Sequence, residues 1–311
     1  MRVLVTGGAG FIGTNLCRHL VDEGADHVVV LDDFSTGFRE NLDGVDVDLV
    51  EGTIVDEALT TKLARDVDAI VHLGARGSVP RSVADPVASH VANATGTLVV
   101  LEAARHTDTA QVIVASSSSV YGANPKLPKR EDLAQLPKSP YAASKVATEG
   151  YAIAYQHSYE LPVLALRFFN VFGPYQAVGH AYAAVVPAFV EAALLRKPLP
   201  VHGDGTQSRD FTYVDNVVGL IADALARRVV YPEPVNLAFG TRTDLLTLIA
   251  MLEDVFGRSL EREHGPRRAG DADHTESDPT RMHSLFPDVV AVPLEEALRT
   301  TVAWYERALA R

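Results

Sequence analysis

Tyr141 and Lys145 are the two residues whose types and spacing point most directly to chemistry. Residues four apart on a helix share one face. A free tyrosine has a pKa of about 10 and is a poor base at neutral pH, but a nearby ammonium and the positive ring of a nicotinamide cofactor favour the phenolate. Such a pair can accept a proton from a substrate hydroxyl while hydride leaves for the cofactor. Because the same spacing is common on ordinary helix surfaces, its meaning depends on the rest of the chain.

Four consecutive serines, Ser116 to Ser119, follow the apolar strand expected at residues 111–115. Serines at a strand end often satisfy loop backbone groups, and one or two of these have that role. The chemical alternative is that one hydroxyl binds the reacting oxygen and relays its proton to Tyr141.

A glycine-rich turn near the N-terminus predicts the cofactor that this chemistry needs. Gly8, Gly10 and Gly13 are spaced G-x-G-x-x-G between an apolar strand at residues 2–6 and a helix at 11–23. Glycine there allows a tight turn, close approach of the backbone to a pyrophosphate, and tight packing of the helix on the strand. The diphosphate then rests on the N–H groups at the N-terminus of the helix. The pattern predicts a dinucleotide site.

Asp32 and Asp33 follow the apolar strand at residues 27–31, and Asp32 lies 19 residues after Gly13. At this distance a carboxylate meets the adenosine ribose hydroxyls. A carboxylate would repel a 2′-phosphate, so NAD is expected rather than NADP. The simpler interpretation, a solvated pair of acids at a strand end, is disfavoured by the glycine turn that precedes it.

Apolar strands alternate with helical patterns in the first half, which predicts the α/β class with a Rossmann-like, doubly wound parallel sheet. Further strands are expected near residues 47–51, 69–73, 111–115 and 163–166, and helices at 56–65, 87–106 and 140–158.

After residue 174 the alternation ends. Helices are expected at residues 183–196, 214–226, 245–256 and 294–310, with a segment rich in proline and glycine at 198–209 and a strand at 234–238. We therefore expect an NAD-binding domain at 1–174, with return segments near 210–240. Residues 175–209 and 241–311 are expected to form a smaller substrate-binding lobe, with the cleft at the carboxyl ends of the strands.

Composition excludes several functional classes. The chain has 311 residues, is 47% hydrophobic and carries a net charge of −12. That charge argues against nucleic acid and anionic membranes as partners, so an anionic substrate must be met by a few local arginines. The single cysteine, Cys17, excludes an internal disulfide and fits a reducing, cytoplasmic setting. The chain starts directly with a strand, and no apolar run approaches membrane-spanning length.

Five motifs together resemble the extended short-chain dehydrogenase/reductase family, on the branch of UDP-glucose 4-epimerase and related nucleotide-sugar epimerases. They are Thr-Gly-Gly-Ala-Gly-Phe-Ile-Gly at 6–13, the segment 116–122, Tyr-Ala-Ala-Ser-Lys at 141–145, Arg-Phe-Phe-Asn at 167–170 and Ser-Arg-Asp-Phe-Thr-Tyr-Val-Asp at 208–215. The resemblance spans residues 2–278, with the motifs in the family's order.

The resemblance implies a role for each matching position. The catalytic residues are Ser117, Tyr141 and Lys145. The NAD-binding residues are Gly7, Gly10, Phe11, Ile12, Gly13, Asp32, Asp33, Thr53, Ile54, Leu73, Ala75 and Asn93, with Tyr141 and Lys145. The residues that bind a UDP-sugar are Ser117, Ser118, Tyr141, Asn170, Val186, His202, Arg209, Arg268 and Thr275, of which the two arginines clamp the diphosphate.

Three positions depart from the family pattern. Thr53 replaces a commoner acid near adenine, the stretch Leu-Gly-Ala-Arg at 73–76 replaces Leu-Ala-Ala, and Gly77 stands where some epimerases have a lysine. These differences change details of the cofactor contacts, while NAD binding is still expected.

The serines before Val-Tyr-Gly favour epimerisation over elimination. Dehydratases and decarboxylases of the family place an acid where this chain has Ser118 and Ser119. We therefore expect a 4-epimerase that interconverts UDP-glucose and UDP-galactose through a 4-keto sugar. Thr275 replaces a bulky tyrosine of hexose-restricted relatives, which would also admit N-acetylhexosamines. The alternatives are a UDP-glucuronate 4-epimerase, a dehydratase or decarboxylase, and a non-catalytic NAD-binding regulator.

No metal site is expected. The loop that carries Asp271, Asp273, His274, Glu276 and Asp278 matches no standard ligand spacing. The histidines His72 and His180 are assigned to packing or to the surface, whereas His202 could stack near a uracil. The family resemblance also favours a homodimer, formed by helices 87–106 and 142–158 of two copies.

Overall fold

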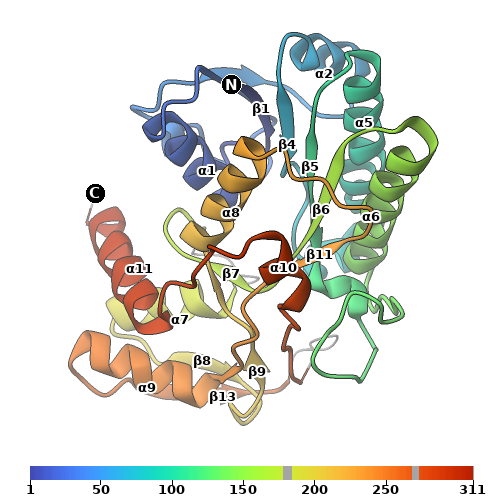
Figure 1. Cartoon of the computed structure of the whole chain (residues 1–311). Coiled ribbons are helices and arrows are strands. Elements are labelled where there is room, and N and C mark those ends of the chain that lie inside the picture. The colour runs from blue at the N-terminus through green and yellow to red at the C-terminus, as the bar shows by residue number, and fades with distance from the viewer. Residues whose placement is uncertain (178–183, 268–272, 311) are drawn as a thin grey trace.

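The computed structural model describes residues 1–177, 184–267 and 273–310, and a seven-stranded parallel sheet forms its centre (Figure 1). The strand order is β11-β6-β5-β4-β1-β2-β3. The strands are β1 (Arg2–Thr6), β2 (His27–Asp32), β3 (Asp48–Glu51), β4 (Ala69–His72), β5 (Val112–Ser117), β6 (Val163–Phe168) and β11 (Val235–Leu237). The chain runs outward from β1 to β3 and then crosses to β4. Ligands of such sheets bind at the carboxyl ends of the strands where the order reverses, here between β1 and β4. The predicted doubly wound, Rossmann-like sheet is confirmed.

Successive side chains of β1 pack on opposite faces of the sheet. Val3 and Val5 belong to the apolar cluster that includes α1 (Phe11–Asp22) and α8 (Val214–Ala226), whereas Leu4 belongs to the cluster on the other face. That second face is covered by α2 (Glu57–Ala64), α5 (Gly96–His106) and α6 (Pro140–Tyr159). Helices on both faces explain why the strands are almost entirely apolar.

Local sequence determines where α6 begins. The Ser139 hydroxyl accepts a hydrogen bond from the Ala142 amide at 3.1 Å, and Pro140 occupies the first helical position. Proline is tolerated there because its missing N–H would have no partner inside the helix. This start, expected from the sequence, places Tyr141 and Lys145 in the first two turns of the helix.

The helix expected at 87–106 has three parts. They are α4 (Pro86–His90), a π-helical turn η2 (Val91–Thr95) and α5. Single π-helical turns often mark functional sites, and this one carries Asn93. The short helix α3 (Val79–Ala84), which precedes α4, was not predicted, because six residues with a proline show no clear helical period.

The remaining elements lie mainly below the sheet in the view of Figure 1. The helices are α7 (Val185–Leu194), α9 (Leu245–Phe256), α10 (Thr280–Leu285) and α11 (Leu294–Leu309), with 3-10 turns η1 (Arg39–Leu42) and η3 (Ser118–Tyr121) elsewhere in the chain. Three two-stranded pairs are β7 (Val171–Phe172) with β10 (Thr212–Tyr213), β8 (Leu199–His202) with β13 (Arg262–Gly265), and β9 (Ser208–Arg209) with β12 (Thr243–Asp244). Within the described residues, no helix combines the length and apolar content needed to cross a bilayer.

Strand β11 joins the large sheet beside β6, and α8 packs near α1. Strands β5 and β6 each run two residues further than predicted. β5 extends to Ser117 and β6 to Phe168, because their backbones remain paired through Ser116 and Arg167 and through Ser117 and Phe168.

Candidate active site

The glycine turn between β1 and α1 leaves no space for side chains. Gly7 has a φ of +72°, and a Cβ there would lie 2.8 Å from the Cα of Gly74. A Cβ on Gly13 would lie 2.2 Å from the Gly7 carbonyl oxygen. Gly7, Gly10 and Gly13 line a cavity, so a ligand there can approach the backbone of the turn and the first residues of α1. These are the features that a dinucleotide pyrophosphate requires.

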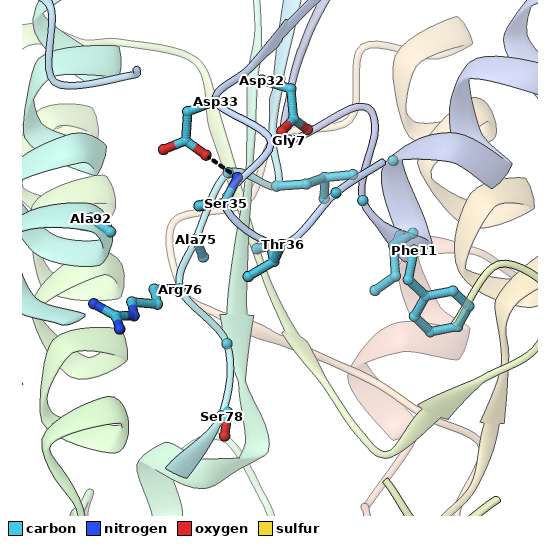
Figure 2. A pocket seen from close by; sticks show the side chains of 18 of the residues that line it. Gly7, Phe11, Asp32, Asp33, Ser35, Thr36, Ala75, Arg76, Ser78 and Ala92 are labelled. Carbon is cyan, nitrogen blue, oxygen red and sulfur yellow. Dashed lines mark hydrogen bonds between the residues drawn. The ribbon is translucent and has the colours of Figure 1, made fainter. Parts of the chain in front are cut away.

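The two acids at the end of β2 have different environments. Asp32 is buried, and its carboxylate accepts hydrogen bonds from the amides of Ala9 and Phe34, both at 2.9 Å. Burial raises the pKa of Asp32, against the effect of those two hydrogen bonds. Asp33 is exposed and accepts a hydrogen bond from the Ser35 amide at 2.9 Å, as Figure 2 shows. Asp32 thus fixes the shape of the glycine turn, and both acids line the cavity beside it.

That cavity has a volume of about 590 Å³ and lies at the carboxyl ends of the central strands. This volume suits a cofactor of dinucleotide size. Its lining includes Gly7, Gly10, Phe11, Ile12, Gly13, Asp32, Asp33, Thr53, Ile54, Leu73 and Ala75, all expected to bind NAD. Figure 2 shows Phe11 on one side of the cavity and Arg76 and Ala92 on the other.

Ser117, Tyr141 and Lys145 line the same cavity, so the structure brings the three expected catalytic residues together beside the glycine turn. The Lys145 ammonium donates a hydrogen bond of 2.8 Å to the Ala115 carbonyl oxygen at the end of β5. Ser117 hydrogen-bonds to Tyr141, and its hydroxyl also accepts from the Ser119 amide at 3.1 Å. The cavity wall thus carries a phenol, a hydroxyl and an ammonium.

Burial determines the acid–base properties of these groups. It raises the pKa of Tyr141, while the hydrogen bond from Ser117 lowers it. It also lowers the pKa of Lys145 to about 8. Since Lys145 remains mainly protonated at neutral pH, it can supply positive charge to the site. The net shift of the Tyr141 pKa is upward, opposite to the direction expected from Lys145.

A second cavity, of about 200 Å³, shares Asn170 and Val171 with the first. Its lining includes Val186, His202 and Arg209, three of the residues expected to bind substrate. Arg209 also donates hydrogen bonds to the carbonyl oxygens of Ser208 and Asp273. A ligand that passes Asn170 would reach from Tyr141 to Arg209.

Asn170 has a φ of +29°, and its side-chain amide nitrogen holds it in place. The nitrogen donates hydrogen bonds to the Asp210 carbonyl oxygen at 3.0 Å and to the Thr275 hydroxyl at 3.1 Å. Thr275 does not line either cavity, and its hydroxyl also accepts a hydrogen bond from the Asp210 amide at 3.3 Å.

Asn93 and Ser118 were expected to touch ligands but do not line the two cavities. The Asn93 side chain accepts a hydrogen bond from the Arg76 amide at 2.7 Å and donates one to the Ser144 hydroxyl at 2.8 Å, so it supports the cavity wall from behind. Ser118 begins the turn η3. Arg268, His180 and Asp271 lie outside the described residues.

Several residues that line the first cavity were not predicted from the sequence. They are Phe34, Ser35, Thr36, Gly37, Phe38, Ser78, Arg81, Ala92, Phe168 and Ala177. Five of them follow Asp33 directly. A run of small polar residues and glycine after a strand that ends in an acid was the available signal for this loop.

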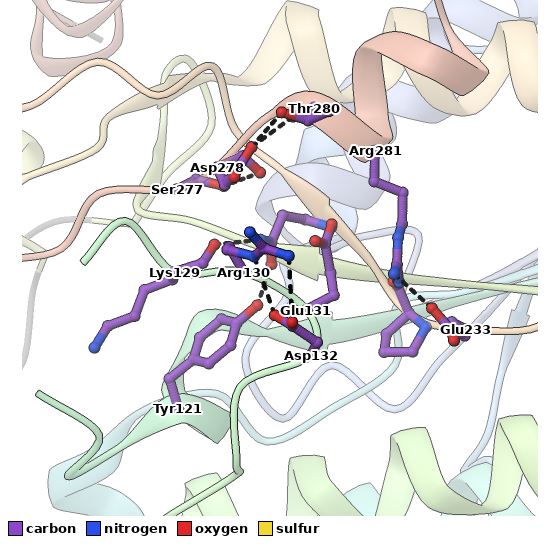
Figure 3. Close-up of polar contacts among 12 residues, drawn as sticks. Tyr121, Lys129, Arg130, Glu131, Asp132, Glu233, Ser277, Asp278, Thr280 and Arg281 are labelled. Carbon is purple, nitrogen blue, oxygen red and sulfur yellow. Dashed lines mark hydrogen bonds and ion pairs between the residues drawn. The ribbon is translucent and has the colours of Figure 1, made fainter. Parts of the chain in front are cut away.

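A buried polar network behind the site was also missed. Arg167 pairs with Glu149, and its guanidinium donates to the Tyr121 hydroxyl at 2.8 Å. The Tyr121 hydroxyl in turn donates to the Asn236 side chain at 2.6 Å. Figure 3 shows Tyr121 and the neighbouring loop with Glu131, where Arg130 pairs with Asp132. The network links β6 and α6 to β11.

Among residues 1–177, 184–267 and 273–310, no cluster of three or more His, Cys, Asp or Glu side chains is arranged to hold a metal ion. His72 is buried and bonded to threonines on both sides, in agreement with its assignment to packing.

The chain is similar to nucleotide-sugar enzymes over its whole length. It is 38% identical over 314 residues to a UDP-glucose 4-epimerase of Mycolicibacterium smegmatis, with 98% of each chain covered. Among solved structures, it matches the UDP-N-acetylglucosamine 4-epimerase of Methanobrevibacter ruminantium M1 in complex with UDP-N-acetylmuramic acid. The TM-score is 0.94 at 35% identity, covering 99% of this chain and 98% of that one.

It also matches the UDP-glucuronic acid 4-epimerase of Bacillus cereus in complex with UDP-glucuronic acid and NAD. The TM-score is 0.91 at 30% identity, covering 99% of this chain and 100% of that one. The model of the NAD dependent epimerase/dehydratase family matches residues 3–238. The cavity beside the glycine turn fits the cofactor that gives this family its name. The chain therefore belongs to the NAD dependent epimerase/dehydratase family.

Proposed function

We propose that the protein is an NAD-dependent 4-epimerase of UDP-sugars, acting on UDP-glucose and UDP-galactose and also on the N-acetylhexosamine pair. The observation that carries the proposal is that Ser117, Tyr141 and Lys145 line one cavity with the glycine turn. Asn170 connects that cavity to the one that holds Arg209. A sugar at the first cavity and a nucleotide at the second is the arrangement that a UDP-sugar requires.

Each residue has a distinct task in the proposed reaction. Tyr141 accepts the proton of the sugar 4-hydroxyl, and Ser117, hydrogen-bonded to Tyr141, binds the same oxygen. Lys145 supplies positive charge that favours the phenolate. When bound, NAD supplies a reversible acceptor for the C4 hydride. Once the 4-keto sugar has turned, Tyr141 would return the proton to the C4 oxygen.

The local charge supports an anionic substrate despite the net charge of −12. Arg209 lines the second cavity and can form paired hydrogen bonds with a diphosphate. His202 and Val186 line the same cavity, where a flat base could pack.

The activity can be tested with purified protein and a panel of UDP-sugars. Proton NMR would follow conversion of UDP-glucose, UDP-GlcNAc and UDP-glucuronate, and absorbance would follow any transient reduced nicotinamide. We expect conversion of the first two and none in Tyr141→Phe. Conversion of UDP-glucuronate alone would move the proposal to a uronate epimerase, and release of water or CO₂ would indicate a dehydratase or decarboxylase. Absence of both conversion and reduction with every sugar would favour a non-catalytic NAD-binding regulator.

We also propose that the protein works as a homodimer in the cytoplasm. Three valines, Val83, Val87 and Val91, are 65%, 71% and 40% exposed on and around α3 and α4, and Tyr151 on α6 is 39% exposed. Burial of this apolar group against a second copy would stabilise the dimer. Sedimentation of the wild type beside Val87→Asp tests the proposal, with dimer expected for the first and monomer for the second. A single buried cysteine suits the reducing cytoplasm.

A further inference from the structure

A buried chain of hydrogen bonds runs beneath the NAD cavity and has His72 at its centre. The ring nitrogens of His72 lie 2.8 Å from the Thr6 hydroxyl (Nδ1) and 3.0 Å from the Thr97 hydroxyl (Nε2). His72 is 3% exposed and both threonines are buried as deeply, so water does not compete for these bonds. Residues of β1, β4 and α5 are thereby connected.

The groups at the two ends of this hydrogen-bond chain determine which group donates in each hydrogen bond. The Thr97 hydroxyl donates its proton to the Asn93 carbonyl oxygen at 2.6 Å, because a carbonyl can only accept. Toward His72 the Thr97 oxygen must therefore accept, and Nε2 of His72 carries a hydrogen. In a neutral ring Nδ1 is then the acceptor, and it takes the proton of Thr6. The Thr6 oxygen remains available for the Gly74 amide, which donates to it at 3.2 Å.

The ring is neutral because of its surroundings. Burial lowers the pKa of His72 to about 3, and the charge of Lys145 on α6 acts in the same direction. A second hydroxyl, that of Thr148 on α6, donates to the same Asn93 carbonyl oxygen at 3.1 Å. Each polar group of the chain is satisfied by the Nε2–H form of a neutral imidazole, and the other tautomer would set two acceptors against each other.

Both ends of the hydrogen-bond chain reach the wall of the NAD cavity. Gly74 lines that cavity and touches the glycine turn, where a Cβ on Gly7 would lie 2.8 Å from the Gly74 nitrogen. At the other end, the side chain of Asn93 holds the Arg76 amide and the Ser144 hydroxyl. Ser144 directly precedes Lys145. The segment 73–76 is thus fastened at both ends by groups that His72 joins.

We propose that His72 is a positioning residue for NAD: as a neutral Nε2–H imidazole, it holds segment 73–76 against the glycine turn in the shape that the dinucleotide fits. The proposal rests on the proposed function of this cavity as the NAD site of a UDP-sugar epimerase. It adds a residue that does not itself line the cavity and that acts through Thr6 and Thr97.

The tautomer is tested directly by NMR on the NAD-loaded protein with ¹⁵N-labelled histidine. The chemical shifts of the two ring nitrogens show which one carries the proton. We expect His72 to be neutral and protonated on Nε2 at neutral pH. A ring protonated on Nδ1, or on both nitrogens, would overturn the proposal. This measurement requires no variant and no sugar, so its result does not depend on whether the protein is an epimerase.

The link to NAD is tested by the rate at which purified, NAD-loaded protein loses its cofactor on dilution and ultrafiltration. Thr6→Val keeps the shape of the side chain but removes the hydroxyl, and we expect NAD to be lost about tenfold faster. Thr6→Ser, the matched control, retains the hydroxyl and should hold NAD as the wild type does. His72→Phe should match Thr6→Val.

The double variant Thr6→Val/His72→Phe distinguishes positioning from general loss of packing. If the two residues act as one chain, the double variant loses NAD no faster than about the worse single variant. Multiplied effects, or equal loss from Thr6→Ser and Thr6→Val, would contradict the proposal. An epimerase assay on the NAD-loaded wild type, run in parallel, shows separately whether the proposed function fails.

Discussion

Arg167 on β6 and Glu149 on α6 form a two-pronged ion pair inside the protein. The guanidinium nitrogens Nε and Nη2 lie 2.9 and 2.6 Å from the two carboxylate oxygens, and the side chains are 2% and 4% exposed. The same carboxylate accepts the Ser116 hydroxyl at 2.9 Å. Glu149 therefore connects the helix that carries Tyr141 to β6 through Arg167, and to β5, the strand that ends at Ser117, through Ser116.

Removal of one partner of this pair should destabilise the protein strongly. Glu149→Leu leaves the positive charge of Arg167 buried without a counter-charge. Arg167→Met likewise leaves the negative charge of Glu149 buried without a counter-charge. Each should lower the free energy of unfolding by about 3–5 kcal/mol, measured by urea denaturation. The double variant should lose less than the sum of the two single losses. Losses that simply add would show that the two residues are not coupled.

Tyr141→Phe should abolish proton transfer while the cofactor remains bound. The phenol is the group placed to exchange the proton of the substrate hydroxyl, and loss of such a group reduces kcat by about 10²–10⁴-fold. Lys145 keeps its own hydrogen bond to Ala115, so the bound NAD, measured after denaturation, should remain close to the wild-type amount. If Tyr141→Phe retained more than a tenth of the wild-type kcat, another residue would have to be the base.

Asp210 should make stability depend on pH between about 4 and 6. Burial raises its pKa from 3.8 to about 6, although amides of Ser277 and Gly240 donate to its carboxylate. Between these values the folded protein binds more protons than the unfolded chain, so this group makes stability fall as pH rises through that range and leaves it constant above it. Asp210→Asn lacks the ionisation. The difference in unfolding free energy between variant and wild type should therefore grow, in favour of the variant, from pH 4 to 6. A difference that is constant with pH would contradict the assignment.

Two glycine-to-alanine changes should differ in outcome: one should cause loss of NAD, and the other should raise the stability of the protein. Gly13→Ala places a Cβ 2.2 Å from the Gly7 carbonyl oxygen, so the glycine turn must shift and NAD should be lost during purification. Gly219 lies inside helix α8, and a Cβ there would meet no atom within 4 Å. Gly219→Ala should therefore stabilise the protein by roughly 0.5–1 kcal/mol. Thermal unfolding and the ratio of bound NAD to protein measure both effects. A Gly13→Ala protein with a full complement of NAD would show that the turn tolerates the shift.

Local signals in the sequence were sufficient for the features that depend on neighbouring residues. The glycine turn, the capped start of α6 and the Tyr141–Lys145 spacing each lie within a few positions, and the structure contains all three. The alternation of apolar strands and helices was likewise enough for the doubly wound sheet, because both faces of its strands are buried.

Features that depend on distant residues were not accessible in the same way. Asn93 was expected at the cofactor, but the π-helical turn directs its side chain to Arg76 and Ser144, and no local pattern marks such a turn. Similarly, Ser116 and Ser117 are equivalent in sequence. The family resemblance singled out Ser117, and the structure shows the physical difference: Ser116 donates to Glu149 on α6, whereas Ser117 hydrogen-bonds to Tyr141.

The double engagement of Asp32 has a consequence for engineering. Its carboxylate braces both the amide of Ala9 in the glycine turn and the amide of Phe34 in the next loop, whereas Asp33 faces outward. A redesign toward dinucleotides with a 2′-phosphate could replace both acids. It would remove their repulsion of that phosphate, but it would also remove the two hydrogen bonds that Asp32 accepts from the loops. A redesign confined to Asp33 and the exposed residues after it would leave the scaffold intact, so the two neighbouring acids are unequal targets for altering cofactor choice.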